Sequence, residues 1–143
     1  GLGAPVGSLL CGTKTFIDKA KQNRKLLGGA LRQGGIAAAP AIYALEHNIE
    51  RLSEDNANAA LCASLLSNLK KIKVQTSVQT NIVMLDLADA GITPVDFCAK
   101  AKDLGLLIRP ILKTSVRLVF YNAITKDDAA GAANIIKKLD NEL

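Results

Sequence analysis

The pattern of hydrophobic and polar residues begins with one short apolar run near the N-terminus. After that run, the spacing of the hydrophobic residues becomes helical. Residues 6–11, VGSLLC, are nearly all apolar and lie between Pro5 and Gly12, which predicts a fully buried strand. A strand buried on both faces needs a larger sheet beside it, and we expect that sheet to come from upstream. In the chain alone, the strand is expected to pair with a symmetry-related copy or to rearrange.

Two helices are predicted next, over residues 13–27 and 36–46. Thr13 suits the N-cap of the first helix, and the glycine pair at 28–29 is a strong signal for its end. Pro40 fits the second helix if it falls in the first turn, and otherwise implies a kink.

A third, longer helix is predicted over residues 48–69, with Asn48 as its N-cap. Leucines recur along one face, and alanines between them allow close packing. Lys70 and Lys71 suit the C-terminal end of this helix, because cations there interact favourably with the helix dipole.

The pattern changes in the second half of the chain. Residues 81–87, NIVMLDL, are β-branched and apolar, which predicts a strand. A helix is then expected to begin with Thr93 as cap, Pro94 as its first residue, and Asp96 reaching back as in a capping box. It should end near residue 104, just before Gly105.

Two more strands, over residues 106–108 and 116–121, and a final helix complete the predicted elements. Thr125 and Asp128 repeat the capping-box pattern at the start of that helix. Its core-facing residues are Ala129, Ala133, Ile136 and Leu139.

This order of elements predicts an α+β fold with a small antiparallel sheet. We expect residues 1–72 to be helical material at the end of a large domain. Residues 73–143 are expected to form a small C-terminal domain with an antiparallel sheet and helices.

Composition supports a folded domain of ordinary size. Hydrophobic residues make up 49% of the 143, enough for a core. No apolar run reaches the roughly 20 residues that span a bilayer, and no signal peptide is evident, so we expect no membrane contact. Cys11, Cys62 and Cys98 are odd in number and widely spaced. They are expected to be buried free thiols, without a metal site, in a reducing compartment such as the cytoplasm.

The positive net charge allows one further class of partner, nucleic acid. The net charge is +5, and six basic residues crowd the first quarter of the chain. Nucleic-acid binding is therefore an alternative, but three Phe, two Tyr and no Trp offer no platform for stacking bases. A solvated helix face, with at most one anion site, is the favoured interpretation.

Arg117 is the most informative single residue, because it lies inside the apolar strand SVRLVFY. On a pleated strand it shares a face with Val119 and Tyr121, and its immediate neighbours point the other way. It is expected either at a solvated edge or facing a cleft that holds a carboxylate, which its planar guanidinium binds at two points.

Other candidate residues have weaker patterns. Lys25 and Arg32 flank the glycine turn at 28–29, which suits a phosphate but also an ordinary surface turn. His47, the only histidine, lies beside a predicted helix end, and a surface or capping role is favoured over catalysis.

Three segments together match one known family. They are GLGAPVGSLLCG at the start, RKLLGGALRQGGIAAAPAIYALEHNIERLSEDNANAA after it, and SVRLVFYN near the C-terminus. The combination resembles the low-specificity L-threonine aldolases, pyridoxal phosphate (PLP) enzymes of fold type I. The resemblance implies that the parent protein cleaves L-threonine or L-allo-threonine to glycine and acetaldehyde, with PLP as the electron sink.

The resemblance also implies roles for particular residues. Arg117 aligns with the arginine that binds the substrate carboxylate. Lys25 and Arg32 align with basic residues that serve the cofactor phosphate or a neighbouring subunit's site. The parent enzyme is expected to be a homo-oligomer, a dimer or a tetramer.

The family's Schiff-base lysine immediately precedes GLGAPVG, so it is expected to lie outside this chain. Gly1, Leu2 and Gly3 then correspond to the loop after that lysine, close to the cofactor. We therefore expect no catalytic residue among the 143, no covalently bound PLP, and no activity of the chain alone. Another hypothesis is a non-catalytic module that self-associates or binds a protein through an exposed apolar face.

Overall fold

The computed structural model describes residues 1–75 and 77–143, which divide into two compact units. One unit contains residues 2–49, and the other contains Gly1 and residues 50–143. The predicted division between residues 72 and 73 falls inside the second unit. The assignment of residues 1–72 to a PLP large domain stays a prediction.

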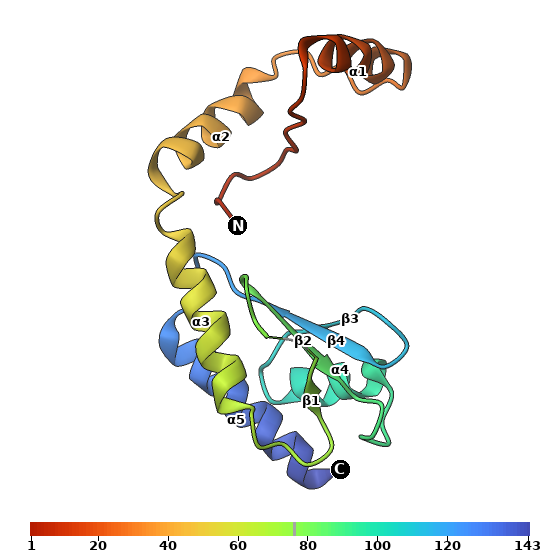
Figure 1. Cartoon of the computed structure of the whole chain (residues 1–143), viewed down its shortest axis with the longest axis vertical. Coiled ribbons are helices and arrows are strands. Elements are labelled where there is room, and N and C mark those ends of the chain that lie inside the picture. The colour runs from red at the N-terminus through yellow and green to blue at the C-terminus, as the bar shows by residue number, and fades with distance from the viewer. Residues whose placement is uncertain (76) are drawn as a thin grey trace. The chain divides into compact units, whose positions relative to one another are not determined.

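Helix α1, Lys14–Leu26, confirms the first predicted helix (Figure 1). The hydroxyl of Thr13 accepts a hydrogen bond from the N–H of Phe16 at 3.4 Å, as expected of an N-cap. At the other end, Gly28 has a φ of 74°, in the region that glycine enters without steric cost.

Helix α2, Gly35–His47, confirms the second helix and contains Pro40 as its sixth residue. This position lies beyond the first turn, so the proline leaves the carbonyl of Ile36 without its helical N–H donor. Of the two predicted positions for Pro40, inside the first turn or beyond it, the structure has the unfavourable second one.

Asn48 ends α2 rather than starting the next helix, so the predicted N-cap is wrong. Its backbone N–H donates to the carbonyl of Ala44, and its side-chain amide donates to the carbonyl of Leu2 at 2.7 Å. The side chain thus has a long-range partner, which a local capping pattern does not reveal.

Helix α3 runs over Leu52–Leu65 and is shorter than predicted at both ends. Arg51 occupies the N-cap position without a capping hydrogen bond. Its guanidinium instead donates to both carboxylate oxygens of Asp55, at 2.8 and 2.9 Å. This hydrogen-bonded pair raises the pKa of Arg51 and stabilises charge on the largely buried Asp55.

The strand predicted over residues 6–11 does not form. The segment is irregular, and Val6, Leu9 and Leu10 are 64%, 75% and 63% exposed. No strand pairs with it among the described residues, so its backbone has no ladder to join. The expectation that this run pairs with a second copy or rearranges in the chain alone stays a prediction.

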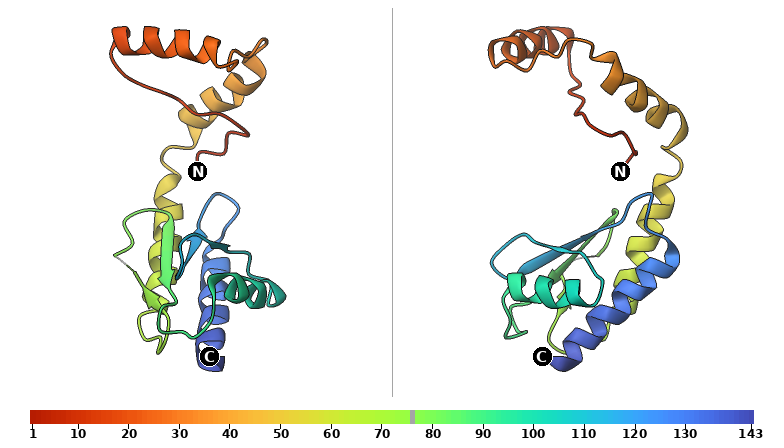
Figure 2. Two further views of the ribbon diagram at one scale, coloured as in Figure 1. Left: turned by 90° about the vertical axis from the view of Figure 1, so that its right-hand side faces the viewer. Right: turned by 180° about the vertical axis from the view of Figure 1, so that it is seen from behind.

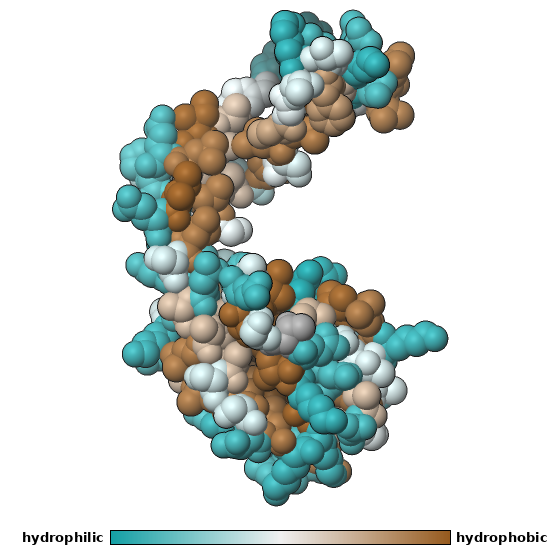
Figure 3. All heavy atoms as spheres, viewed as in Figure 1, coloured by the Kyte–Doolittle hydropathy of each residue, from teal (hydrophilic) through white to brown (hydrophobic). Residues whose placement is uncertain are grey.

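The N-terminal unit has almost no core of its own. Between residues 2 and 49, Ala44 is the only buried residue. Figure 3 shows hydrophobic side chains gathered on the surface over α2. The exposed large apolar residues of this unit are Val6, Leu9, Leu10, Phe16, Leu26, Leu27, Leu31, Ile36, Ile42, Tyr43, Leu45 and Ile49.

The C-terminal unit contains a four-stranded antiparallel sheet in the order β1-β2-β4-β3. Its strands are β1 Lys73–Val74, β2 Ile82–Asp86, β3 Arg109–Pro110 and β4 Ser115–Val119. Together with the five helices of residues 1–75 and 77–143, this sheet confirms the α+β class.

Two strands differ from the sequence prediction. The first strand, β1, was not predicted, because two residues are too few to show an alternating pattern. The third strand, β3, begins later in the sequence than the predicted 106–108. After it, the N–H of Ile111 donates to the carbonyl of Ser115 at 3.0 Å and closes the hairpin between β3 and β4.

Helices α3, α4 (Pro94–Asp103) and α5 (Lys126–Glu142) cover one face of this sheet (Figures 1 and 2). Alternate residues of β2 and β4 point into the layer between sheet and helices, and α3 packs along α5. The predicted core residues of α5 are all buried there. One compact two-layer core results, built around Val83, Leu85, Phe97, Val116, Leu118 and Ile136.

Both predicted capping pairs are found, with one difference. Thr125 and Asp128 form the full reciprocal box at the start of α5. At the start of α4, the hydroxyl of Thr93 accepts from the N–H of Asp96, but the carboxylate of Asp96 accepts from that hydroxyl rather than from the backbone. Gly105, with a φ of 89°, follows the end of α4 as predicted.

Asp140, in the last turn of α5, connects this helix to the turn before β1. Its carboxylate is 3% exposed and accepts hydrogen bonds from the backbone N–H groups of Lys70, Lys71 and Ile72, at 2.8, 2.9 and 2.9 Å. Burial alone would raise the pKa of Asp140, but these three donors outweigh it and lower the pKa below its ordinary value.

We expect Asp140→Asn to destabilise the chain by about 2–3 kcal/mol, because three buried N–H groups lose a charged acceptor. A pKa that is lowered by folding adds stability above the unfolded value of about 4, and this stability is lost as the pH falls through the folded value. The difference in midpoint between wild type and variant should therefore shrink as the pH is lowered from 7 to 3.

Urea unfolding followed by circular dichroism measures both effects. Glu142→Gln is the matched control, since it removes one negative charge from the same turn at a side chain that is 50% exposed. Equal losses in the two variants would contradict the role given to Asp140.

Candidate functional site

Strand β4 presents Arg117 on the face of the sheet that α3, α4 and α5 leave uncovered. Val116 and Leu118 are buried beneath the helices, Arg117 is half-buried, and Val119 is 42% exposed. The predicted division of this strand into two faces is therefore confirmed. Since β2 and β3 flank β4 on either side, Arg117 lies within the sheet and not on an edge strand.

Arg117 has no carboxylate partner in residues 1–75 and 77–143. Its Nε is buried without a hydrogen-bond acceptor there, and none of the ion pairs in that part of the chain includes it. Asp86 is on the same face, but its Oδ1 accepts the N–H of Ala88 at 3.1 Å. A buried donor without an acceptor is costly, which makes Arg117 a candidate for binding an external anion.

The strand register adds a second arginine that the sequence analysis did not single out. Arg109 on β3 is directly opposite Arg117, and Met84 on β2 is opposite it on the other side. Arg109 is exposed. A correct register for β3 would have revealed this pair, but the sequence placed that strand at residues 106–108.

Next to this pair, two polar side chains are already satisfied by each other. The side-chain amide of Gln75 donates to the hydroxyl of Ser115 at 2.7 Å, and Ser115 is 1% exposed. Among the described residues, Gln75 and Ser115 therefore leave the guanidinium of Arg117 without a partner from these two side chains.

The two other predicted basic residues are in the N-terminal unit. Lys25 ends α1, Arg32 follows the glycine turn, and both are exposed. Neither forms an ion pair within the described ranges. Their role toward a cofactor phosphate or a neighbouring subunit stays a prediction.

Side chains donate hydrogen bonds to two carbonyls of the loop at residues 1–3, and the carbonyl of Gly1 accepts from the guanidinium of Arg51 at 3.4 Å. The carbonyl of Leu2 accepts the side-chain amide of Asn48, and Gly3 has a φ of 90° beside the same amide. The positive φ of Gly3 favours glycine, and a Cβ added there would lie 3.3 Å from Asn48 Nδ2, a tight contact. Gly1 is exposed.

His47 is at the surface at the end of α2, as expected. Its ring stacks on that of Tyr43, with centroids 4.1 Å apart, and its Nδ1 donates to the Tyr43 carbonyl at 2.9 Å. This arrangement completes the helix end without bringing His47 to a second ionisable group.

The three cysteines are free thiols as predicted, but only one of them is buried. Cys62 is buried, which raises its pKa to about 11, whereas Cys98 is half-buried and Cys11 is exposed. Cys11 is exposed because the run 6–11 forms no strand and packs into no core. Within the described ranges, no three His, Cys, Asp or Glu residues converge in a way that could hold a metal ion.

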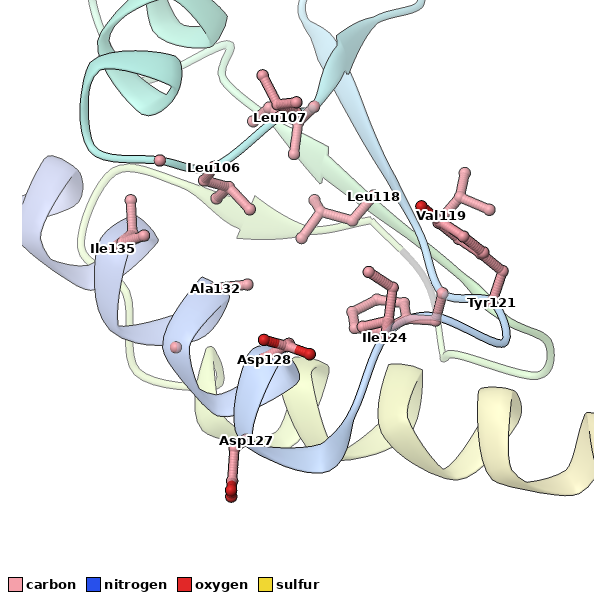
Figure 4. A pocket seen from close by; sticks show the side chains of 14 residues that line it. Leu106, Leu107, Leu118, Val119, Tyr121, Ile124, Asp127, Asp128, Ala132 and Ile135 are labelled. Carbon is pink, nitrogen blue, oxygen red and sulfur yellow. The ribbon is translucent and has the colours of Figure 1, made fainter.

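A cavity of about 450 Å³ opens between the end of β4 and the first half of α5 (Figure 4). Leu106, Leu118, Ile124 and Ile135 give it an apolar lining. Asp127 points away from it in Figure 4, and Asp128 is used as the cap of α5, where the hydroxyl and N–H of Thr125 lower its pKa. The cavity contains none of the predicted site residues, and its ionisable lining residues are Tyr121, Asp127 and Asp128.

Comparison with known proteins identifies the family. Residues 1–90 match the family model described as beta-eliminating lyase. The chain belongs to this family. In the described ranges, no helix of this beta-eliminating lyase chain is long and apolar enough to cross a bilayer.

Its relatives include low-specificity L-threonine aldolases. The chain is 34% identical over 141 residues to a probable low-specificity L-threonine aldolase 2 of Arabidopsis thaliana, covering 97% of this chain and 40% of that protein. It is 36% identical over 133 residues to the low specificity L-threonine aldolase of Escherichia coli K12, covering 93% and 38%. This lyase chain thus spans about two fifths of the length of these relatives.

A solved structure supports the same fold. The ornithine delta-aminotransferase of Plasmodium falciparum matches with a TM-score of 0.61 and 25% identity, over 74% of this chain and 29% of that one. The family and this structural neighbour support PLP as the cofactor of the parent enzyme, as predicted.

The predicted basic residues of this lyase chain belong to its two compact units. Lys25 and Arg32, within residues 2–49, are exposed and form no ion pair in the described ranges, which leaves their charges available to a phosphate. Arg51 Nε and Arg117 Nε are both buried without an acceptor in the described ranges. The guanidinium of Arg51 already binds Asp55, whereas that of Arg117 has no carboxylate partner there and fits an external carboxylate.

Replacement of Arg117 tests whether it stabilises the fold or is free for a ligand. We expect Arg117→Met to leave the unfolding free energy unchanged or to raise it by up to about 1 kcal/mol, because an unpaired donor and a like charge opposite Arg109 are removed. Urea unfolding of the 143-residue chain measures this change.

Val116→Ala is the control on the opposite face of the same strand. It creates a cavity in the core and should cost roughly 1–3 kcal/mol. A comparable loss in Arg117→Met would mean that Arg117 has a structural role.

Proposed function

We propose that this chain is the C-terminal part of a PLP-dependent aldolase that cleaves L-threonine or L-allo-threonine to glycine and acetaldehyde. In this proposal the chain supplies the residue that binds the substrate carboxylate, Arg117. PLP, when bound in the whole enzyme, takes up the electron pair left on the α-carbon as the carbon–carbon bond breaks.

The unpaired guanidinium of Arg117 is the observation that carries the proposal. It lies on an uncovered sheet face, half-buried, with its Nε lacking an acceptor among the described residues. A carboxylate bound there would satisfy this donor and would fix the orientation of an amino-acid substrate through two parallel hydrogen bonds. The similarity to low-specificity L-threonine aldolases supports threonine as the proposed substrate.

The surface of the N-terminal unit supports the proposal that this chain is one part of a larger enzyme. Its twelve exposed large apolar side chains and single buried residue leave it without a core. Such a surface is unfavourable in water, at about 25 cal/mol per Å², and is typical of a face that packs against more protein. We propose that this face is covered by the remainder of the aldolase.

Activity of the full-length protein that carries these residues tests the proposal. It should release acetaldehyde from threonine, and Arg117→Gln should raise KM for threonine by about 30-fold, as expected for losing roughly 2 kcal/mol of charge-assisted hydrogen bonding. Coupled reduction of acetaldehyde by alcohol dehydrogenase provides the measurement.

The control in this assay is Lys102→Gln, which removes one positive charge from the exposed side of α4. Its KM should match that of the wild type. The 143-residue chain alone, mixed with PLP and threonine, should release no acetaldehyde. An unchanged KM in Arg117→Gln would contradict the role of Arg117, and turnover by the chain alone would contradict its proposed inactivity.

A second candidate function is a non-catalytic module that associates with itself through the same apolar surface. The exposed leucines and isoleucines of residues 2–49 favour it, because a patch of this kind drives association when nothing covers it.

We expect the chain alone to form dimers or larger species at micromolar concentration. The double variant Leu26→Gln, Leu27→Gln removes two side chains that are 83% and 86% exposed and should shift the chain toward monomer. Multi-angle light scattering measures the mass. A wild-type chain that stays monomeric at high concentration would rule out this second function.

A further inference from the structure

Two arginines on adjacent strands face the same side of the sheet without a compensating charge. Arg109 on β3 and Arg117 on β4 are direct partners in the antiparallel register. Residues in this relation project to one face, with Cβ atoms about 4.5–5.5 Å apart. Like charges placed directly opposite destabilise a sheet, so this pair needs an explanation.

No acid in the described ranges forms an ion pair with either arginine. Asp86 is the only acidic residue in the four strands, and its register partners are Lys73 and Ser115. Arg117 additionally keeps a buried Nε without an acceptor within residues 1–75 and 77–143. The missing partner is therefore an anion from outside this group of residues.

We propose that Arg109 is a second carboxylate-binding residue, which together with Arg117 holds the α-carboxylate of the amino-acid substrate. This inference rests on the proposed function, since it assigns Arg109 to the same site as Arg117. Arg117, half-buried and fixed in the middle strand, forms the hydrogen bonds that orient the carboxylate. Arg109, exposed at the edge strand, adds attraction and tightens binding.

Carboxylate binding to the 143-residue chain tests the pair directly. Sodium acetate is titrated against sodium chloride at constant ionic strength, while NMR follows the arginine Nε–Hε resonances. In the wild type, the Arg117 resonance should shift and saturate. Arg109→Gln should raise the apparent Kd for acetate roughly threefold, as expected for removing one neighbouring charge in water. Arg117→Gln should abolish saturable binding.

Two further variants separate charge from structure. Arg109→Lys keeps the charge and should bind acetate within roughly twofold of the wild type, because its contribution is mainly electrostatic. Lys102→Gln, which removes a charge from α4, should bind as the wild type does. Dispersed amide spectra show in each case that the variant is folded.

The outcomes are distinct. An Arg109→Gln variant that binds acetate as tightly as the wild type overturns the inference and leaves the role of Arg117 intact. A wild-type chain in which acetate causes no more change than chloride also overturns it. Failure of the proposed aldolase function is seen separately, as absence of acetaldehyde release by the full-length protein.

Discussion

The alternation of side chains along strand β4 is the constraint on which the rest of the C-terminal unit depends. Val116 and Leu118 must point toward α3, α4 and α5 to close the core, so Arg117 between them must point away. The same two-residue period thus builds the hydrophobic layer and displays the guanidinium. A shift of one residue in register would bury the charge and expose the core at once.

Features set by neighbouring residues were predictable, and those set by distant ones were not. The caps at Thr13, Thr93 and Thr125 depend on residues three positions away, and all three are present. Asn48 was misassigned because its amide bonds to Leu2, 46 residues earlier. The run at 6–11 was misassigned because apolar composition alone does not provide a pairing strand.

In the candidate site, too, features that depend on the local sequence were predictable and features that depend on distant residues were not. The position of Arg117 on the uncovered face follows from the local pattern of its strand, and the structure agrees. Its pairing with Arg109 depends on which residue of β3 meets which residue of β4, and no local pattern contains that information. The role of Arg117 comes from family resemblance combined with an unsatisfied donor, and neither of them alone names a substrate.

The bond between Asp140 and the turn at 70–72 joins parts of the chain that are 68 to 70 residues apart. The intervening residues form the whole sheet and α4, so bringing the carboxylate to its three N–H groups early closes a long loop while those elements are still unfolded. We therefore expect this contact to form late in folding, since long loops are costly to close early. An interaction absent from the transition state acts on the unfolding rate, so Asp140 would set how long the folded unit persists rather than how fast it forms.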